Sequence, residues 1–183
     1  MHLYAVSYLP TIEEYPLRAS RQEIIDKLNG IMDALTSQLK IIKENREQWT
    51  KYVLDMQKGM KIKLDLIRNL EEDINFQRNL VKKISETDFS GIPINIPIVF
   101  ELHKFANSTL ESIEKMKSKG NPEILSEIQS KFYIFKNTLL DFVTDLEMIL
   151  PRKGKKALEN LEAIIEERNN LTKAIAYTIK EED

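Results

Sequence analysis

The stretch that decides the fold is residues 20–49, SRQEIIDKLNGIMDALTSQLKIIKENREQW. Ser20, followed three residues later by Glu23, forms a capping box, in which the serine hydroxyl accepts from a backbone amide and the glutamate reaches back. Behind this cap, apolar side chains recur every three or four residues, as on one buried face of a helix. These apolar residues are Ile24, Leu28, Ile31, Leu35, Leu39 and Ile42. The stretch therefore predicts an amphipathic helix that begins near residue 21.

The apolar seam continues beyond this stretch. No proline occurs between Ser20 and Ser85, and a seam position recurs about every 3.5 residues from Leu28 to Ile84, a period typical of coiled-coil-like packing. Six polar residues, 43–48, interrupt the apolar pattern, and even the seam position there is Arg46. We expect residues 43–48 to form a solvated waist.

Chain length limits how the seam is covered. A continuous helix over residues 21–85 would be roughly 98 Å long, whereas a compact domain of this length has a radius of gyration of about 16 Å. The sequence therefore predicts that residues 21–48 form a projecting coiled-coil-like helical arm and residues 49–183 a helical bundle. The apolar stripe of the arm then needs a cover.

Three covers are open. The arm pairs with its copy in a second subunit, folds back as a fifth helix, or binds a different protein. We favour pairing, which makes the six apolar residues of the arm the self-association surface. Folding back requires a break in the waist or near Gly59, and Asn29–Gly30 is a further candidate for a break.

The rest of the chain predicts further helices. Pro97 favours a helix start, and so does the pair Asn121–Pro122 after Gly120. We expect helices over about 98–119, 122–150 and 153–179, with Trp49 in the core. The fold class is all-α: an up-down four-helix bundle with one long helix extending beyond it, or five helices if that helix is broken.

Residues 1–20 form the remaining segment. Pro10 and Pro16 preclude a long helix there, so we expect an extended N-terminal arm. It either straps over the body of its own chain or is exchanged with a second subunit. The first ten residues lack the basic start of a signal peptide, and no apolar run is long enough to span a membrane. We expect a cytoplasmic protein.

Composition argues against most catalytic chemistry. The chain of 183 residues has no cysteine, which excludes disulfides and thiolate sites, and only two histidines, of which His103 is an unpromising base. Its five glycines are too far apart for a phosphate-binding loop. We interpret Glu71–Glu72–Asp73 as a solvated face rather than a metal site. We therefore expect no metal, no cofactor, no small-molecule substrate and no enzyme.

Two loops predicted to share one end of the bundle are the most distinctive surface. Residues 89–98 alternate isoleucine with proline and asparagine, and residues 151–156 carry four cations. Cations at a helix N-terminus oppose its dipole, which suggests a functional reason for them. The residues proposed to bind a partner or an anion are Ile92, Ile94, Ile96, Arg152, Lys153, Lys155 and Lys156. The alternative is that the isoleucines plug the end of the bundle.

The sequence thus favours a protein-interaction or structural assembly module, self-associating as a homodimer through its long N-terminal helix or binding another protein. The formal net charge of −2 argues against nucleic-acid binding by the whole surface. Binding of nucleic acid or an anionic membrane through the two loops is the less favoured alternative, since the isoleucines can plug the bundle end while the lysines only keep it soluble. The chain carries no motif that resembles a family.

Overall fold

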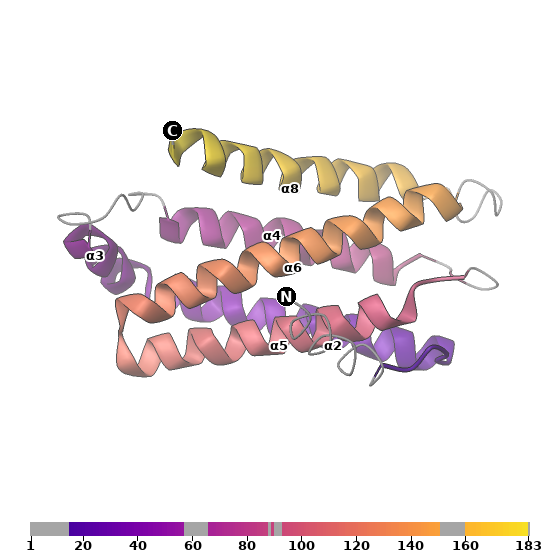
Figure 1. The fold of residues 1–183 in the computed structure, drawn as a ribbon, viewed down its shortest axis with the longest axis horizontal. Helices are drawn as coiled ribbons and strands as arrows, with labels where there is room; N and C mark the ends of the chain where they lie inside the picture. The colour runs from indigo at the N-terminus through magenta and orange to yellow at the C-terminus, as the bar shows by residue number, and fades with distance from the viewer. Residues whose placement is uncertain (1–14, 57–65, 88, 90–92, 151–159, 183) are drawn as a thin grey trace, which may run out of the picture.

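The computed structural model describes residues 15–56, 66–87, 89, 93–150 and 160–182. These residues form an all-α bundle (Figure 1). Its helices are α2 (Arg21–Glu44), α3 (Arg46–Met56), α4 (Leu66–Ser85), α5 (Ile96–Lys119), α6 (Pro122–Ile149) and α8 (Leu161–Glu182). The predicted all-α class, with helices packed as a bundle, is confirmed.

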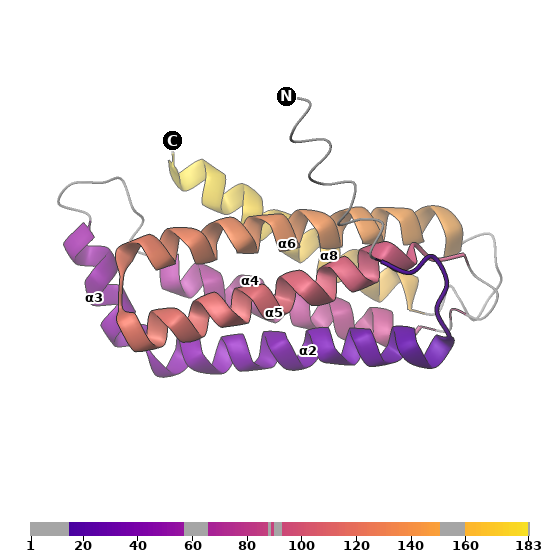
Figure 2. The same cartoon turned by 60° about the horizontal axis from the view of Figure 1, so that its bottom comes forward.

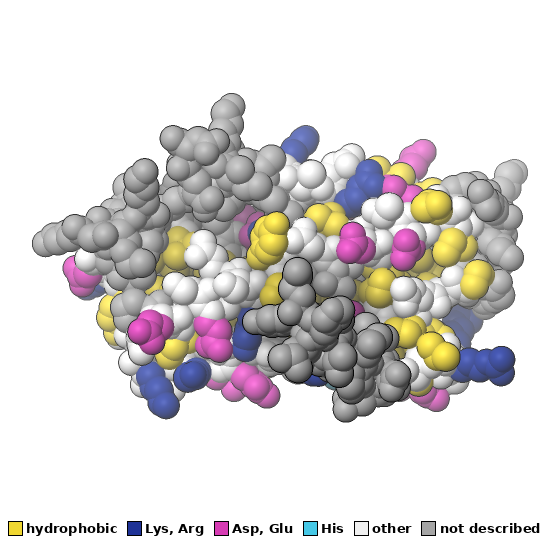
Figure 3. Space-filling view, viewed as in Figure 1, with side chains coloured by type: hydrophobic (Ala, Val, Ile, Leu, Met, Phe, Trp, Pro, Cys, Tyr) yellow, Lys and Arg dark blue, Asp and Glu magenta, His cyan; other side chains and the backbone are white. Residues whose placement is uncertain are grey.

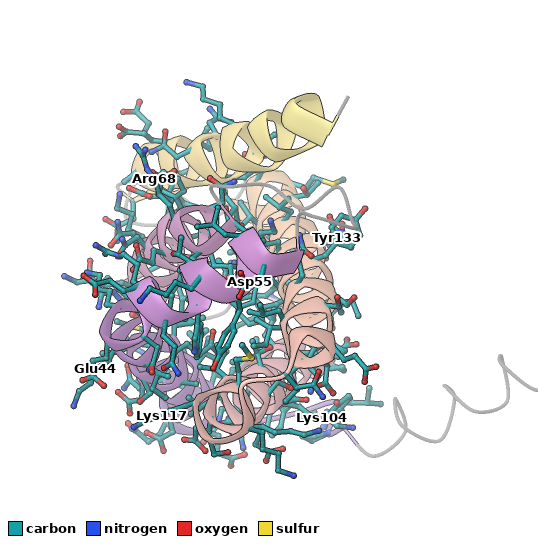
Figure 4. The ribbon with its side chains drawn as sticks, turned by 90° about the vertical axis from the view of Figure 1, so that its left-hand side faces the viewer. Glu44, Asp55, Arg68, Lys104, Lys117 and Tyr133 are labelled. Atoms are coloured by element: carbon teal, nitrogen blue, oxygen red, sulfur yellow. The ribbon has the colours of Figure 1, made fainter. Side chains whose placement is uncertain are left out.

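Five of these helices run along the long axis of the molecule. α2 packs against both α4 and α5, α5 packs against α6, and α8 lies on α4 with a smaller contact to α6. Figures 1 and 2 show that α2, α5 and α8 begin at one end of the bundle. α4 and α6 end there. The short α3 crosses the opposite end, as Figure 4 shows from that side.

The helix that the sequence could have continued to residue 85 is broken at Asn45, inside the predicted waist. Its backbone leaves helical geometry (φ −109°, ψ 11°), and its side-chain Nδ2 donates to the carbonyl of Ile41 at 2.7 Å. The next helix starts at once, since the amide of Trp49 donates to the carbonyl of Asn45 at 2.9 Å. Gly30 stays within α2, and Gly59 lies outside the described residues.

The prediction of a projecting arm is wrong for residues 21–44. After the break the chain returns, and α4 and α5 cover the apolar stripe of α2. The six residues expected to mediate self-association are all buried in the core of their own chain: Ile24, Leu28, Ile31, Leu35, Leu39 and Ile42. The alternative of a folded-back helix describes the structure, and these six side chains pack within their own chain.

The capping signals at Ser20, Gly120 and Asn121 place helix ends as expected, whereas α5 begins two residues earlier than predicted, after a cap at Asn95 that was not predicted. The amide of Glu23 donates to Ser20 Oγ at 3.1 Å, while that hydroxyl lies 3.3 Å from Glu23 Oε1. Asn95 caps α5, which begins at Ile96, and Asn121 caps α6. Gly120 ends α5 in the left-handed conformation (φ 56°) that favours glycine.

Gly30 marks a close approach between α2 and α5. A Cβ atom added at this position would lie 2.7 Å from His103 Nε2 and 2.9 Å from His103 Cδ2. Both distances are too short for van der Waals contact. The glycine therefore allows α5 to bring His103 against the backbone of α2, even though glycine is a poor helix former.

We predict that Gly30→Ala lowers the free energy of unfolding. The helix propensity of alanine would raise it by about 1 kcal/mol, but overpacking against His103 lowers it by about 1–3 kcal/mol. In a His103→Ala background the imidazole ring that would clash with the new Cβ is absent, so Gly30→Ala is expected to stabilise the protein. Urea denaturation of the four variants measures both effects. Stabilisation of the wild-type background by Gly30→Ala would contradict the close approach.

Candidate functional site

The most distinctive feature of the described surface is an apolar pocket of about 430 Å³, which we call the end pocket. It lies where α2 begins, α4 ends and α5 begins, at the right-hand end of the bundle in Figure 2. Its apolar lining residues are Leu17, Ala19, Ile24, Ile25, Leu28, Phe89, Pro93, Ile94 and Ile96. Its polar lining residues are Arg21, Ser85 and Thr87.

Three chain segments build this pocket. The capping box starts α2 at its rim, so that Ile24, Ile25 and Leu28 face it from the first two turns. The chain after α4 supplies Phe89 and Pro93, and the Asn95 cap turns the chain into α5. The pocket therefore depends on the two helix caps as much as on its lining side chains.

The two hydroxyl groups in the pocket are engaged with the backbone of α4. Ser85 Oγ donates to the carbonyl of Lys82 at 2.6 Å, and Thr87 Oγ1 donates to the carbonyl of Lys83 at 2.9 Å. Neither hydroxyl proton is therefore available to a ligand. The pocket mainly offers apolar surface, and its volume is in the usual range for ligand sites.

Leu17 extends this apolar surface outward, with 82% of the residue exposed. Hydrophobic side chains also gather on the adjacent face of the bundle, over the half where α5 begins and α6 ends (Figure 3). Single exposed apolar residues are ordinary. An exposed leucine beside an apolar pocket is more informative, because the two can be buried by the same partner.

The structure places two of the predicted loop residues in the end pocket. Ile94 and Ile96 line it and pack against the core, which agrees with the alternative that the isoleucines plug the end of the bundle. Ile92 and the four cations (Arg152, Lys153, Lys155 and Lys156) lie outside the described residues. The start of α8 does lie near the end of α4, because Asn160 Nδ2 donates to the carbonyl of Glu86 at 3.4 Å.

A second hollow, of about 360 Å³, lies between the waist and α4 and is lined by charged groups. Arg46 Nη2 lies 2.8 Å from Glu71 Oε1, and Arg68 Nε lies 3.3 Å from Glu72 Oε1. Arg68 is labelled in Figure 4, on the side of α4 that faces α8. Because these charges pair with one another, the hollow has little unbalanced charge with which to attract an ion.

The acidic run of α4 corrects a sequence prediction. Glu72 is exposed, but Glu71 and Asp73 are buried rather than solvated. Lys136 of α6 reaches across the core, and its Nζ donates to Asp73 Oδ2 at 2.8 Å. Burial raises the pKa of Asp73, and the Lys136 ammonium opposes this rise. The two buried residues of the run are therefore paired within the structure: Glu71 with Arg46, and Asp73 with Lys136 of α6.

His103 is the one histidine among the described residues. Its ring is half-buried against Gly30, and its Nε2 lies 3.4 Å from Asn107 Nδ2. Burial lowers its pKa, and the nearby Lys27 ammonium lowers it further. No described carboxylate bonds to the ring, so it lacks the orienting partner of a catalytic base.

The fold and the site define the chain as an all-α bundle with an apolar pocket at one end. Searches of known protein families, of curated proteins and of solved structures found nothing that matches it. Within the described ranges, no three acidic or histidine side chains are grouped so that they could hold a metal ion. No helix in that part of the chain is long and apolar enough to cross a membrane.

Sequence reasoning missed the end pocket as a whole. It singled out Ile94 and Ile96 but assigned Ile24 and Leu28 to a self-association surface. The signal that could have joined the two sets is the pair of caps, Ser20 and Asn95, which start two helices that pack side by side.

We predict that Lys136→Met lowers the free energy of unfolding by about 3–5 kcal/mol, because it leaves the Asp73 carboxyl group buried without its counter-charge. The double variant Asp73→Leu/Lys136→Met removes both charges and is expected to recover most of this loss. Urea denaturation measures both. As a control, Arg68→Met breaks an exposed pair, for which a loss below about 1 kcal/mol is expected. A similarly small loss for Lys136→Met would contradict the buried pair.

We also predict that His103 contributes to loss of stability in mild acid. Because its pKa is lowered on folding, the unfolded chain binds the proton more readily, and stability falls as the pH drops below about 6.5. The free energy of unfolding measured at about pH 7.5 and 5.5 should therefore fall less for His103→Gln than for the wild type. An equal fall in both proteins would show that His103 does not titrate in this way.

Proposed function

We propose that the protein is a helical protein-interaction module that binds an apolar segment of a partner protein in the end pocket. The observation that carries this proposal is the pocket itself: nine apolar residues from three chain segments surround about 430 Å³ beside the exposed Leu17. The proposed role is binding rather than catalysis.

A protein segment fits this site better than a small polar ligand. Sites for small molecules combine apolar walls with a few convergent polar groups that fix the orientation of the ligand. Here the hydroxyl protons of Ser85 and Thr87 are used by carbonyls of α4. Apolar side chains presented by a partner need only burial, and the backbone that carries them can fix their orientation.

Burial of apolar side chains supplies the affinity. Removing one large aliphatic side chain from water contributes about 1.5–3 kcal/mol, and a few such anchors usually dominate an interface. Ile25 is suited to testing this, because it lines the pocket but is only half-buried in the free protein. Ile24 and Leu28, by contrast, also belong to the core.

A photo-crosslinking amino acid introduced at Leu17 tests the proposal in the cell of origin. We predict protein adducts that are absent when the same amino acid is introduced at Tyr133. Tyr133 is a suitable control because it is also exposed (57%) but lies on α6 away from the pocket (Figure 4). Adducts to a second copy of the chain would identify the partner as the protein itself.

A pocket variant then separates specific binding from chance proximity. In the Leu17-labelled protein, Ile25→Gln should reduce the yield of the adduct by about tenfold, as expected from loss of one buried aliphatic anchor. Thermal denaturation shows whether the variant keeps its fold. Identical adducts from the Leu17 and Tyr133 positions, or adducts unaffected by Ile25→Gln, would contradict the proposed function.

A further inference from the structure

We infer that residues 3–12 of the same chain occupy the end pocket when no partner is bound. The part of this inference that concerns a partner, namely that its segment must displace residues 3–12, rests on the proposed function. Occupancy by the chain's own segment does not.

The position of the described chain is the first argument. Residues 15–19 approach the bundle without helical structure, and two of them, Leu17 and Ala19, already line the pocket. Residue 14 is three positions before Leu17, so its Cα lies within about 11 Å of that residue. The segment that precedes it therefore starts at the rim of the pocket.

The composition of the segment is the second argument. Residues 3–12 contain six large apolar or aromatic side chains and no charged residue. These are Leu3, Tyr4, Val6, Tyr8, Leu9 and Ile12. Pro10 and Pro16 favour an extended chain, and in an extended chain Tyr4, Val6 and Tyr8 project from the same side. The segment thus offers an apolar face to an apolar pocket.

Charged residues near the rim of the pocket support one orientation of residues 3–12. Glu13 and Glu14 directly follow the apolar segment, and Arg18, next to the lining residue Leu17, is exposed. Opposite charges at the edge of an apolar contact favour one register over others. They would hold the acidic end of the segment at the rim, with its apolar residues toward the pocket.

Tethering makes even a weak contact effective. A segment joined by a short linker has an effective concentration in the millimolar range. If its own dissociation constant is about 0.1 mM, the segment weakens the apparent binding of a competing partner about tenfold. The N-terminal segment would thus regulate the same site that we propose for a partner.

The absence of cysteine allows a direct test in the full chain. A spin label is attached to the single cysteine of a Ser7→Cys variant, which leaves the neighbouring apolar residues intact. We expect the label to broaden the methyl NMR signals of Ile25, Leu28 and Ile94 in the pocket. The signals of Val53 and Ile113, toward the opposite end of the bundle, should keep their intensity.

Two controls make this test decisive. Replacing Tyr4, Val6 and Tyr8 together by serine should restore the pocket signals, whereas Thr11→Ser should not. Mixing spin-labelled chains with isotopically labelled chains that carry no spin label should give no broadening. Equal intensities at both ends of the bundle would overturn the inference, and so would broadening that occurs only in the mixed sample, since this would place a second copy in the pocket.

The displacement step is tested separately from both proposals. In the triple-serine variant, the yield of the Leu17 adduct should rise about tenfold over that of the Thr11→Ser control. An unchanged yield in a protein whose pocket signals are broadened by the label would overturn the competition but not the occupancy. Absence of any adduct from Leu17 would count against the proposed function and would leave the spin-label result standing.

Discussion

The constraint on which the structure depends is that the apolar stripe of α2 must be covered, and that the chain covers it by reversing direction. The first break in this path is at Asn45, which leaves helical geometry within a polar segment. α3 then crosses the end of the bundle, and the link from Met56 to Leu66 lies outside the described residues. Once the direction has reversed, α4 lies along α2, and α5 covers the other side of the stripe. Trp49, at the start of α3, closes the end of the core near the break.

Local sequence signals were sufficient for the starts of α2 and α6 and for the end of α5. Ser20 and Asn121 cap α2 and α6, and Gly120 terminates α5 in a left-handed conformation. These signals act within a few residues, so a sequence shows them directly. The apolar period likewise identified the buried face of α2, since all six stripe residues are in the core.

What covers that face could not be predicted from the period. An apolar period that stays in phase across a break gives the same residue spacing whether the chain continues or turns back. Periodicity therefore carries no information on direction. The polar waist was the better signal, since a solvated segment can bend without loss of packing. The same limit applies to Asp73, whose burial depends on Lys136, 63 residues further along the chain. The end pocket combines segments from α2, α4 and α5 and was not predicted.

The reversal also determines where the protein can bind. It uses the α2 stripe within the chain and thereby removes the surface that the sequence suggested for self-association. Apolar surface is left open where α2 and α5 begin and α4 ends, beside the segment that enters from the N-terminus. Interaction with a partner and regulation by residues 3–12 are therefore both proposed at the same end of the bundle.

Small-angle X-ray scattering tests most directly whether α2 is covered by α4 and α5 of its own chain. If α2 folds back on its own chain, the protein scatters as a compact monomer, with a radius of gyration near the value of about 16 Å that scaling gives for this chain length. The comparison is made at protein concentrations low enough that chains do not associate. A maximum dimension approaching the roughly 98 Å of a continuous helix over residues 21–85 would contradict the account.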